Sequence, residues 1–329
     1  MSALPTFGFS TTAEEVSDAL ASEIAGKNVL VTGTSIDGLG FETARAIAKH
    51  ARLVVITGYN AERLRLSVEA IRKDVPQANV QSRVLDLSSM ASVRQVAEEI
   101  NTHTTPLHVI IHNAADTSGV YAVTADGFER QMAVDHFGPF LLTKLIFQKL
   151  LASASGSWLP RVVFVSSAAI AMGPGIDLSL PNLRDPGPDS PQAQSTFLRY
   201  HETKSANVLF ALGLATRAAG RVRAYSLHPG TIYTNALKHD AIIPSMQSLG
   251  VLKDDGQPNL EFGTWKTIGQ GAATSVVAAF DPRLDDKSGA YLVDCVEANE
   301  QRPAVCSDLA NADKLWKLTE EVIGEEFVV

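Results

Sequence analysis

Short runs of β-branched and apolar residues alternate with longer stretches of helical periodicity along most of the chain. Seven such runs predict strands, at Asn28–Thr32, Leu53–Thr57, Val80–Leu85, Val109–His112, Val162–Val165, Val222–Leu227 and Ala290–Val293. Apolar residues spaced three or four apart predict helices over Phe41–His50, Ala61–Asp74, Met90–Thr102, Phe128–Ser153, Leu198–Ala219 and Gln270–Phe280. This alternation is typical of α/β proteins, and predicts a doubly wound, seven-stranded parallel sheet with helices on both faces.

Two segments interrupt the alternation. Residues 173–194 are rich in proline and glycine, and residues 231–269 mix both with apolar residues after the sixth predicted strand. Long loops at the carboxyl ends of parallel strands usually shape ligand sites. We therefore expect a single domain over residues 1–329, in which these two segments shape the site for a substrate.

Composition and charge exclude several classes of protein. The chain is 45% hydrophobic and carries a formal net charge of -8, so it is expected to be globular and to bind no nucleic acid. Cys295 and Cys306 are the only cysteines, and the histidines show no metal-binding spacing, so we expect neither disulfides nor a metal site. The sequence contains no typical signal peptide and no run of about 20 apolar residues, which predicts a cytoplasmic protein without a membrane anchor.

The first candidate site is a glycine-rich loop between a predicted strand and a predicted helix. Glycines at this place let the backbone approach a pyrophosphate, and the start of the helix provides free N–H groups. Glycines also serve in ordinary turns, and the flanking strand and helix favour the phosphate loop. The candidate cofactor-binding residues here are Gly33, Thr34, Ser35, Asp37, Gly38, Leu39 and Gly40.

The second candidate site is Tyr200 with Lys204, near the start of a predicted helix. Residues four apart share one helix face, so both side chains could act on one ligand. A nearby ammonium stabilises a phenolate, which suits a tyrosine for acid/base chemistry. The alternative, a core tyrosine beside a surface lysine, is common for this spacing. Ser167 follows the preceding strand at the edge where ligands bind, and this placement favours the catalytic interpretation.

Together these motifs resemble the short-chain dehydrogenase/reductase family of Rossmann-type folds. The loop is similar to the family's T-G-x-x-x-G-x-G with one extra residue between Gly33 and Gly38, and Tyr200 and Lys204 match its Tyr-x-x-x-Lys. The resemblance covers nearly the whole chain. It looks closest to the branch of retinol dehydrogenases and WW domain-containing oxidoreductases, including fungal members, because of the long insert between Ser167 and Tyr200.

The resemblance implies roles for further residues. Ser167 would hold the substrate oxygen, Tyr200 would exchange the proton, and Lys204 would bind the nicotinamide ribose. Other residues matching cofactor-binding segments of the family are Asp86, Leu87, Asn113, Ala114, Pro229, Gly230, Thr231 and Thr234. Asp86 could instead be a simple turn residue.

Two departures from the family bear on these roles. Asp135 stands where relatives commonly carry an asparagine of the proton relay, so we place it in the catalytic set with an altered role. An ionised aspartate accepts hydrogen bonds but cannot donate them, and its charge would stabilise the ammonium of Lys204. Ala115 replaces a family glycine. Both departures could reduce the catalytic rate or mark a repurposed site.

The end of the second predicted strand indicates which dinucleotide is used. A carboxylate there would bind the ribose hydroxyls of NAD and repel the 2′-phosphate of NADP. This chain has Tyr59 and Asn60 there and no acid, while Arg63 could contact a 2′-phosphate or simply be a solvated helix charge. We expect NADP(H) as cofactor rather than NAD(H).

The resulting prediction is an NADP(H)-dependent oxidoreductase that interconverts a carbonyl and an alcohol on a small lipophilic substrate. Phe197, Ile242, Ile243 and Trp265 lie in or beside the irregular segments and would line an apolar pocket or pack in the core. A non-catalytic NADP-binding scaffold and an NAD-retaining sugar-nucleotide epimerase or dehydratase are the alternatives. Family members are commonly homodimers or homotetramers, which is the assembly that the resemblance implies.

Overall fold

A computed structural model describes residues 4–156 and 158–329. All seven predicted strands are present within these residues, and an eighth, antiparallel strand joins one edge of the sheet. The sheet order is β10-β9-β6-β5-β4-β1-β2-β3. Its strands are β1 (Asn28–Thr32), β2 (Leu53–Gly58), β3 (Val80–Val84), β4 (Val109–His112), β5 (Arg161–Val165), β6 (Arg223–His228), β9 (Tyr291–Val293) and β10 (Val296–Glu297).

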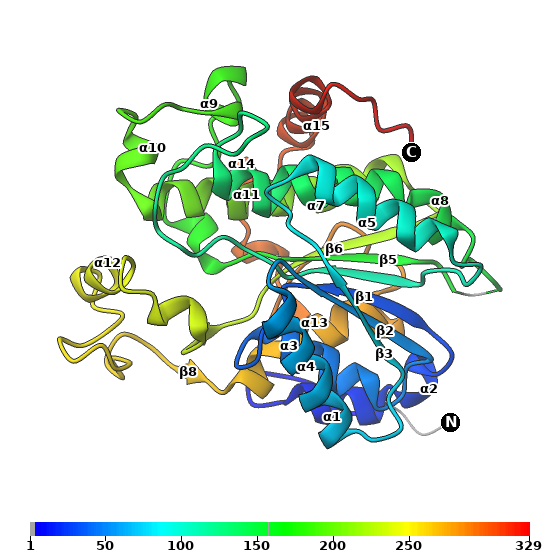
Figure 1. Cartoon of the computed structure of the whole chain (residues 1–329). Coiled ribbons are helices and arrows are strands. Elements are labelled where there is room, and N and C mark those ends of the chain that lie inside the picture. Colours follow the sequence, from blue (N-terminus) through cyan, green and yellow to red (C-terminus); the bar gives the residue numbers. More distant parts are fainter. Residues whose placement is uncertain (1–3, 157) are drawn as a thin grey trace.

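Helices cover both faces of the sheet, as Figure 1 shows. One face carries α1 (Ala13–Ala19), α2 (Ala21–Ile24), α3 (Leu39–Ala48), α4 (Ala61–Asp74) and α13 (Ile268–Phe280). The opposite face carries α5 (Met90–Thr102), α6 (Arg130–Met132), α7 (Gly138–Leu145), α8 (Phe147–Leu151), α11 (Thr196–Arg217) and α15 (Leu309–Ile323). These observations confirm the prediction of a doubly wound Rossmann-type α/β fold.

The central strands are buried on both faces because successive side chains point to opposite sides. Leu30 of β1 packs with the helices of the α11 face, whereas its neighbours Val29 and Val31 pack with those of the α13 face. In β4, Ile110 likewise packs in the core on the α11 face, whereas Val109 and Ile111 pack in the core on the α13 face. The predicted continuous apolar runs thus correspond to strands that contribute to two separate cores.

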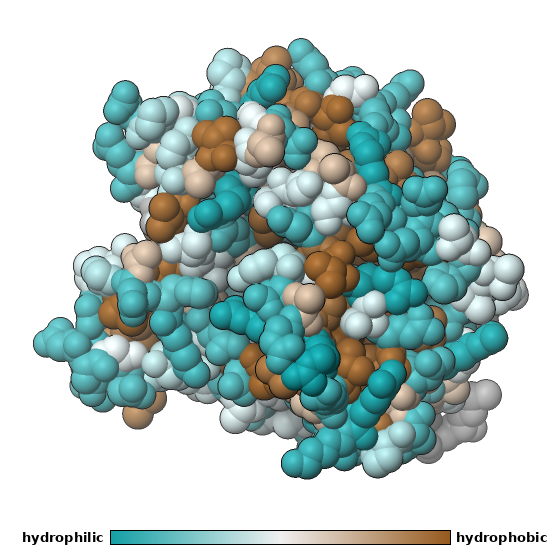
Figure 2. Space-filling model, in the orientation of Figure 1, coloured by the Kyte–Doolittle hydropathy of each residue, from teal (hydrophilic) through white to brown (hydrophobic). Residues whose placement is uncertain are grey.

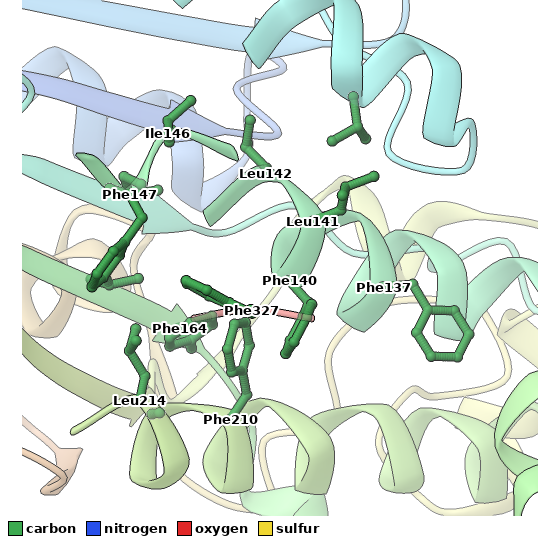
Figure 3. Packing of buried hydrophobic residues seen from close by; sticks show 14 of the residues in the cluster. Phe137, Phe140, Leu141, Leu142, Ile146, Phe147, Phe164, Phe210, Leu214 and Phe327 are labelled. Atoms are coloured by element: carbon green, nitrogen blue, oxygen red, sulfur yellow. The ribbon is translucent and has the colours of Figure 1, made fainter. Parts of the chain in front are cut away.

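Aromatic rings fill the core on the α11 face. Phe140 of α7, Phe164 of β5 and Phe210 of α11 converge with Phe327 from the chain's last residues, as Figure 3 shows. The centroids of the Phe164 and Phe210 rings are 4.8 Å apart, and those of Phe140 and Phe327 are 5.4 Å apart, in an edge-to-face arrangement. Such tilted contacts are the favourable geometry for aromatic pairs. This packing holds α11, and with it Tyr200, firmly against the sheet.

Local caps explain why several predicted boundaries are correct. Asn60 and Ser89 accept hydrogen bonds from the first turns of α4 and α5, whose observed bounds match the predicted ones. The predicted continuous helix over Phe128–Ser153 is wrong. Its place is taken by α6, the π-helical turn η1 (Ala133–Phe137), α7 and α8. Ile146, whose φ of -105° and ψ of 12° lie outside helical geometry, separates α7 from α8.

The two irregular segments lie at the same end of the sheet and contain only short elements. Residues 173–194 include α9 (Leu180–Arg184) and α10 (Pro191–Gln194). Residues 231–269 begin with β7 (Thr231–Ile232) and return through β8 (Trp265–Lys266), which pair as a small second sheet. Between them lie the 3-10 helix η3 (Asn235–Lys238) and α12 (Ile243–Ser248). The remaining short helices are η2 (Ala168–Ala171), η4 (Pro282–Leu284), η5 (Asn299–Gln301) and α14 (Ala304–Ser307).

Candidate active site

Two adjacent serines at the end of β5 have different environments. Ser166 is buried, and its hydroxyl donates to the carbonyl of Lys204 at 2.8 Å. Ser167 is half-buried at the sheet's carboxyl edge, where its Oγ accepts a hydrogen bond from Ala169 N at 3.2 Å. The hydroxyl of Tyr291 donates to the carbonyl of Ser167 at 3.4 Å from behind. Ser166 is therefore committed to the fold, while Ser167 stands at the edge of the site.

Tyr200 and Lys204 lie one turn apart on α11, whose first turn is capped by Ser195. The ammonium nitrogen of Lys204 is 5.4 Å from the centroid of the Tyr200 ring. Lys204 is buried and donates to the carbonyl of Val165 at 3.3 Å, whereas Tyr200 is only half-buried. The structure thus brings both side chains to the end of β5, with the charge held beneath the phenol.

Asp135 completes this group from the π-helical turn η1. Its fully buried carboxylate accepts hydrogen bonds from Asp116 N at 2.7 Å and from the Thr203 hydroxyl at 3.0 Å. The nearer carboxylate oxygen lies 3.4 Å from the ammonium nitrogen of Lys204. Burial raises the pKa of Asp135 to about 6, although the positive charge of Lys204 acts in the opposite direction. A buried carboxyl that titrates near neutral pH therefore sits directly against the lysine.

The glycine-rich loop accommodates its extra residue by a tight turn. Gly38 N donates to the carbonyl of Ser35 at 3.1 Å, and Asp37 adopts a left-handed conformation with φ 61°. Aspartate tolerates this conformation better than most residues. The turn ends at Gly38, the N-cap of α3, which offers no side-chain hydrogen bond to the helix. The inserted residue therefore bulges outward and leaves the strand-to-helix connection intact.

Close packing explains the two outer glycines. A Cβ on Gly40 would lie 2.4 Å from Asn113 Nδ2, and one on Gly33 would lie 2.6 Å from Ala114 Cα. Asn113 Nδ2 donates to the carbonyls of Thr32 and Gly33 at 3.0 and 2.9 Å, fixing β1 and β4 at the point where the strand order reverses. The uncapped start of α3 faces this switch point, which is where dinucleotides bind in such sheets. The residues present therefore fit a pyrophosphate.

The residues expected at the adenosine end lie at the ends of β2 and β3. Asp86 accepts hydrogen bonds from Ser88 N at 2.9 Å and Ser88 Oγ at 2.6 Å, a turn that also presents its carboxyl at the sheet edge. Leu87 is buried, and a Cβ on Gly138 at the start of α7 would lie 2.5 Å from its carbonyl oxygen. Tyr59 is 68% exposed, and Arg63 is exposed without an ion pair among the described residues.

The segment after β6 forms the opposite wall of the site. Gly230 has φ 100°, and a Cβ there would lie 2.7 Å from the Lys266 side chain. Thr231 pairs with Trp265 in the small sheet, and the Thr234 hydroxyl accepts from Ala236 N at the start of η3. Pro229 is buried beneath this turn. The predicted cofactor contacts of this segment therefore all lie where the second irregular segment leaves the sheet.

Several neighbours of the site were not found from the sequence. Thr203 and Asp116 N hold Asp135, and Asn235 Nδ2 donates to the carbonyl of Ile36 at 2.5 Å, linking the second irregular segment to the glycine-rich loop. Thr203 lies beside Lys204 in the sequence and could have been considered with it. A backbone N–H and a contact across 199 residues leave no local signal.

The molecular surface is indented between the lobe that carries α9 and α10 and the lobe that carries α12, as Figure 2 shows in the orientation of Figure 1. The N-terminal half of α11, with Tyr200, runs beneath the first lobe. The described part of the chain contains no group of three His, Cys, Asp or Glu residues that could hold a metal. Within the same residues, no helix is both long and apolar enough to span a membrane.

Comparisons with known proteins agree with this arrangement. The model of the short chain dehydrogenase family matches residues 27–176. The chain is 31% identical to the chloroplastic short-chain dehydrogenase TIC 32 A of Brassica napus, over 96% of this chain and 94% of the relative. It is 33% identical to human retinol dehydrogenase 12, over 92% and 88%, and 33% identical to the WW domain-containing oxidoreductase of Danio rerio, over 92% and 70%.

Solved structures share the fold. An uncharacterised protein from Mycobacterium paratuberculosis superposes with a TM-score of 0.68 at 27% identity, covering 94% of this chain and 98% of that one. A short-chain dehydrogenase from Escherichia coli, complexed with NADPH, gives a TM-score of 0.59 at 21% identity, covering 82% and 97%. The chain therefore belongs to the short-chain dehydrogenase/reductase family, in the branch of retinol dehydrogenases and WW domain-containing oxidoreductases, and is an NAD(P)-dependent oxidoreductase.

Proposed function

We propose that the protein is an NADP(H)-dependent enzyme that interconverts a ketone or aldehyde and an alcohol, with Tyr200 as the acid/base. The observation that carries this proposal is the buried ammonium of Lys204, 5.4 Å from the centroid of the Tyr200 ring at the carboxyl edge of β5. A fixed positive charge stabilises the phenolate that forms when the tyrosine gives up its proton.

Each residue of the set has a distinct task in this proposal. When bound, the nicotinamide supplies or accepts the hydride. Ser167 holds the substrate oxygen by a hydrogen bond, and Tyr200 donates the proton to that oxygen during reduction and removes it during oxidation. Lys204 stabilises the phenolate and binds the nicotinamide ribose, and Asp135 fixes the position of the ammonium through the 3.4 Å contact. Fixing all groups in one geometry removes much of the entropic cost of the reaction.

The preference for NADP(H) is supported by the end of β2. No acid follows this strand, so nothing there repels a 2′-phosphate, and Arg63 extends from the first turn of α4 without an ion pair among the described residues. The structural neighbours complexed with NADPH and with NADP point in the same direction. The residues Gly33–Gly40 would then hold the pyrophosphate, and Asp86 the adenine amino group.

A lipophilic substrate is supported by the curated relatives named retinol dehydrogenases, because retinol is an apolar alcohol. In this chain the second irregular segment provides apolar side chains at the same end of the sheet. Trp265 packs edge-on against Tyr233, with centroids 6.5 Å apart, and Ile242 is buried in the same segment. We also propose that the whole chain acts as one domain around its single large sheet and assembles as a homodimer or homotetramer, which light scattering would test.

The decisive experiment combines cofactor binding with turnover. NADPH should raise the melting temperature of the wild-type protein more than NADH does, and NADPH oxidation should accompany reduction of at least one member of a panel of lipophilic ketones and aldehydes. Tyr200→Phe should retain NADPH binding and lose at least about a hundredfold in kcat, as expected for removal of a general acid.

A non-catalytic NADP-binding protein is the second candidate, favoured by the Asp135 and Ala115 substitutions. It predicts the same thermal shift, no turnover on the panel, and no difference between wild type and Tyr200→Phe.

A further inference from the structure

A buried ionic cluster joins α11, which carries Tyr200, to the start of α6, but has no task in the proposed chemistry. Arg199 donates from Nε to Glu129 Oε2 and from a terminal nitrogen to Glu202 Oε2, both at 2.8 Å. All three side chains are only 3% exposed. Arg199 and Glu202 lie on either side of Tyr200 in the sequence of α11. The cluster is thus built into the same turn of helix that carries the proposed acid/base.

The first irregular segment is attached to this cluster by polar contacts. The remaining carboxylate oxygen of Glu202, Oε1, accepts hydrogen bonds from Gln192 Nε2 at 3.2 Å, Asn182 Nδ2 at 3.4 Å and Asp177 N at 3.5 Å. The other terminal nitrogen of Arg199 donates to the carbonyl of Leu183 at 3.4 Å. The segment's own helices have five and four residues, too few to be stable by themselves. Its conformation therefore depends on what it is attached to.

Glu129 extends the cluster to the turn that carries Asp135. Its carboxylate accepts hydrogen bonds from Gln131 N and Met132 N, both at 2.9 Å, and so caps α6. Its backbone N–H donates to the carbonyl of Arg184 in the irregular segment at 2.8 Å. Since α6 runs directly into η1, the position of Glu129 influences the position of Asp135 against Lys204. One guanidinium therefore joins α11, η1 and residues 173–194.

Burying three charges is an unfavourable way to fill this space. Well-packed apolar side chains of similar volume are often at least as stabilising as a buried ion pair, because charges lose their hydration. The ionic cluster instead fixes the orientation of its members, because the planar guanidinium holds each partner at a defined angle. A network of this kind is better suited to fixing a geometry than to raising stability.

We propose that Arg199 is a positioning residue with two effects. It holds residues 173–194 in place as one wall of the substrate site, and it keeps Asp135 of η1 in contact with Lys204. Figure 1 shows α9 and α10 lying over the N-terminal part of α11, where this wall would stand. The role in substrate binding rests on the proposed carbonyl reduction, whereas the attachment of the segment does not. Arg199 touches neither substrate nor cofactor in this scheme and acts through the groups that it orients.

The test uses variants of the full chain to separate the attachment of residues 173–194 to Glu202 from the link that Arg199 makes to Glu129. The double variant Asn182→Ala/Gln192→Ala removes two donors from the irregular segment and leaves the three charges paired. Arg199→Met removes the common partner. Arg217→Met is the matched control, because Arg217 lies on the same helix and pairs with Asp313 at the surface, away from the irregular segment. Hydrogen exchange of residues 173–194 is measured with and without saturating NADPH, together with NADPH affinity and steady-state kinetics on a carbonyl from the panel.

Amide exchange in residues 173–194 should be about tenfold faster in the double variant, corresponding to the loss of hydrogen bonds to a charged group. KM for the carbonyl should rise at least about fivefold while kcat and NADPH affinity stay unchanged. Arg199→Met should show both effects and also a lower kcat with an altered pH profile, because η1 is released. Arg217→Met should match wild type in all of these measurements.

Unchanged exchange of residues 173–194 in the double variant would overturn the proposal, and so would faster exchange with an unaltered KM. If Arg199→Met does not fold, the double variant alone decides. The exchange measurement needs no turnover, so a wild-type protein that reduces no carbonyl would refute the proposed function without deciding the attachment, which exchange reports independently.

Discussion

Replacing Asp135 by asparagine tests the electrostatics of the site most directly. The substitution keeps the shape of the side chain and one of its two accepting oxygens, which can remain on Asp116 N, while the new Nδ2 group can donate to the Thr203 hydroxyl. It removes the buried charge and introduces the asparagine that the family resemblance implies at this position. Lys204 keeps its hydrogen bond to the carbonyl of Val165. The variant therefore changes ionisation at one position while most of the local geometry persists.

The expected effect follows from the pKa of the carboxyl. Burial raises the pKa of Asp135 from its ordinary value of 3.8 to about 6 in the folded protein. Between these values the folded protein binds this proton more tightly than the unfolded chain, so unfolding releases it. The contribution of Asp135 to the free energy of unfolding therefore falls as pH rises through this interval and is fully lost above about 6. The difference corresponds to about 3 kcal/mol at 1.36 kcal/mol per pKa unit.

Urea denaturation of wild type and Asp135→Asn at pH 4.5 and pH 7.5 measures this difference. Relative to wild type, the free energy of unfolding of the variant should be about 2 kcal/mol larger at pH 7.5 than at pH 4.5, because pH 4.5 already lies above the unfolded pKa. The pH–rate profile of wild type should change slope near pH 6, and that change should be absent from Asp135→Asn. Asp240→Asn is the control, because this exposed carboxylate has no hydrogen bond or ion pair among the described residues. Parallel stability curves for wild type and Asp135→Asn would refute the assignment of a raised pKa.

Two further predictions concern the cofactor. Gly40→Ala should lower stability by about 1 to 3 kcal/mol and abolish the thermal shift by NADPH, because the new Cβ would lie 2.4 Å from Asn113 Nδ2. Gly263→Ala, whose Cβ would meet nothing within 4 Å, should change neither in the same melting assay. Arg63→Ala should weaken NADPH binding about tenfold, the value of one charge-assisted contact, and leave NADH binding unchanged in titration calorimetry. Equal losses for both dinucleotides, or an equal loss in Arg65→Ala on the same helix, would contradict contact with the 2′-phosphate.

Most of the fold could be predicted because its signals are local. Strands such as β1 and β4 are continuous apolar runs because they are buried on both faces, and α4 and α5 begin where Asn60 and Ser89 can cap them. The π-helical turn η1 could not be predicted, because its apolar spacing fits an ordinary helix equally well. Asp135 in this turn pairs with Asp116 N and Lys204, and such contacts between distant segments leave no local signal.

The candidate site divides in the same way. Tyr200, Lys204 and Ser167 could be proposed from the sequence because a helix turn and a strand end place them, and the structure brings them to one sheet edge. The hydrogen bonds that hold Asp135 and the ionic cluster of Arg199 depend on contacts between segments far apart in the sequence. A single arginine in a helical pattern indicates an exposed charge far more often than a buried hub, so sequence gave no reason to select Arg199.

The small sheet of β7 and β8 has a consequence for how this enzyme could be redesigned. Thr231 pairs with Trp265 and Ile232 with Lys266, so the chain departs from the scaffold and rejoins it at neighbouring positions. When the two ends of a loop are already held together, a change in its length costs little conformational entropy. The stretch between β7 and β8 could therefore be replaced as a unit to change which substrates are accepted, while the residues for hydride transfer stay unchanged.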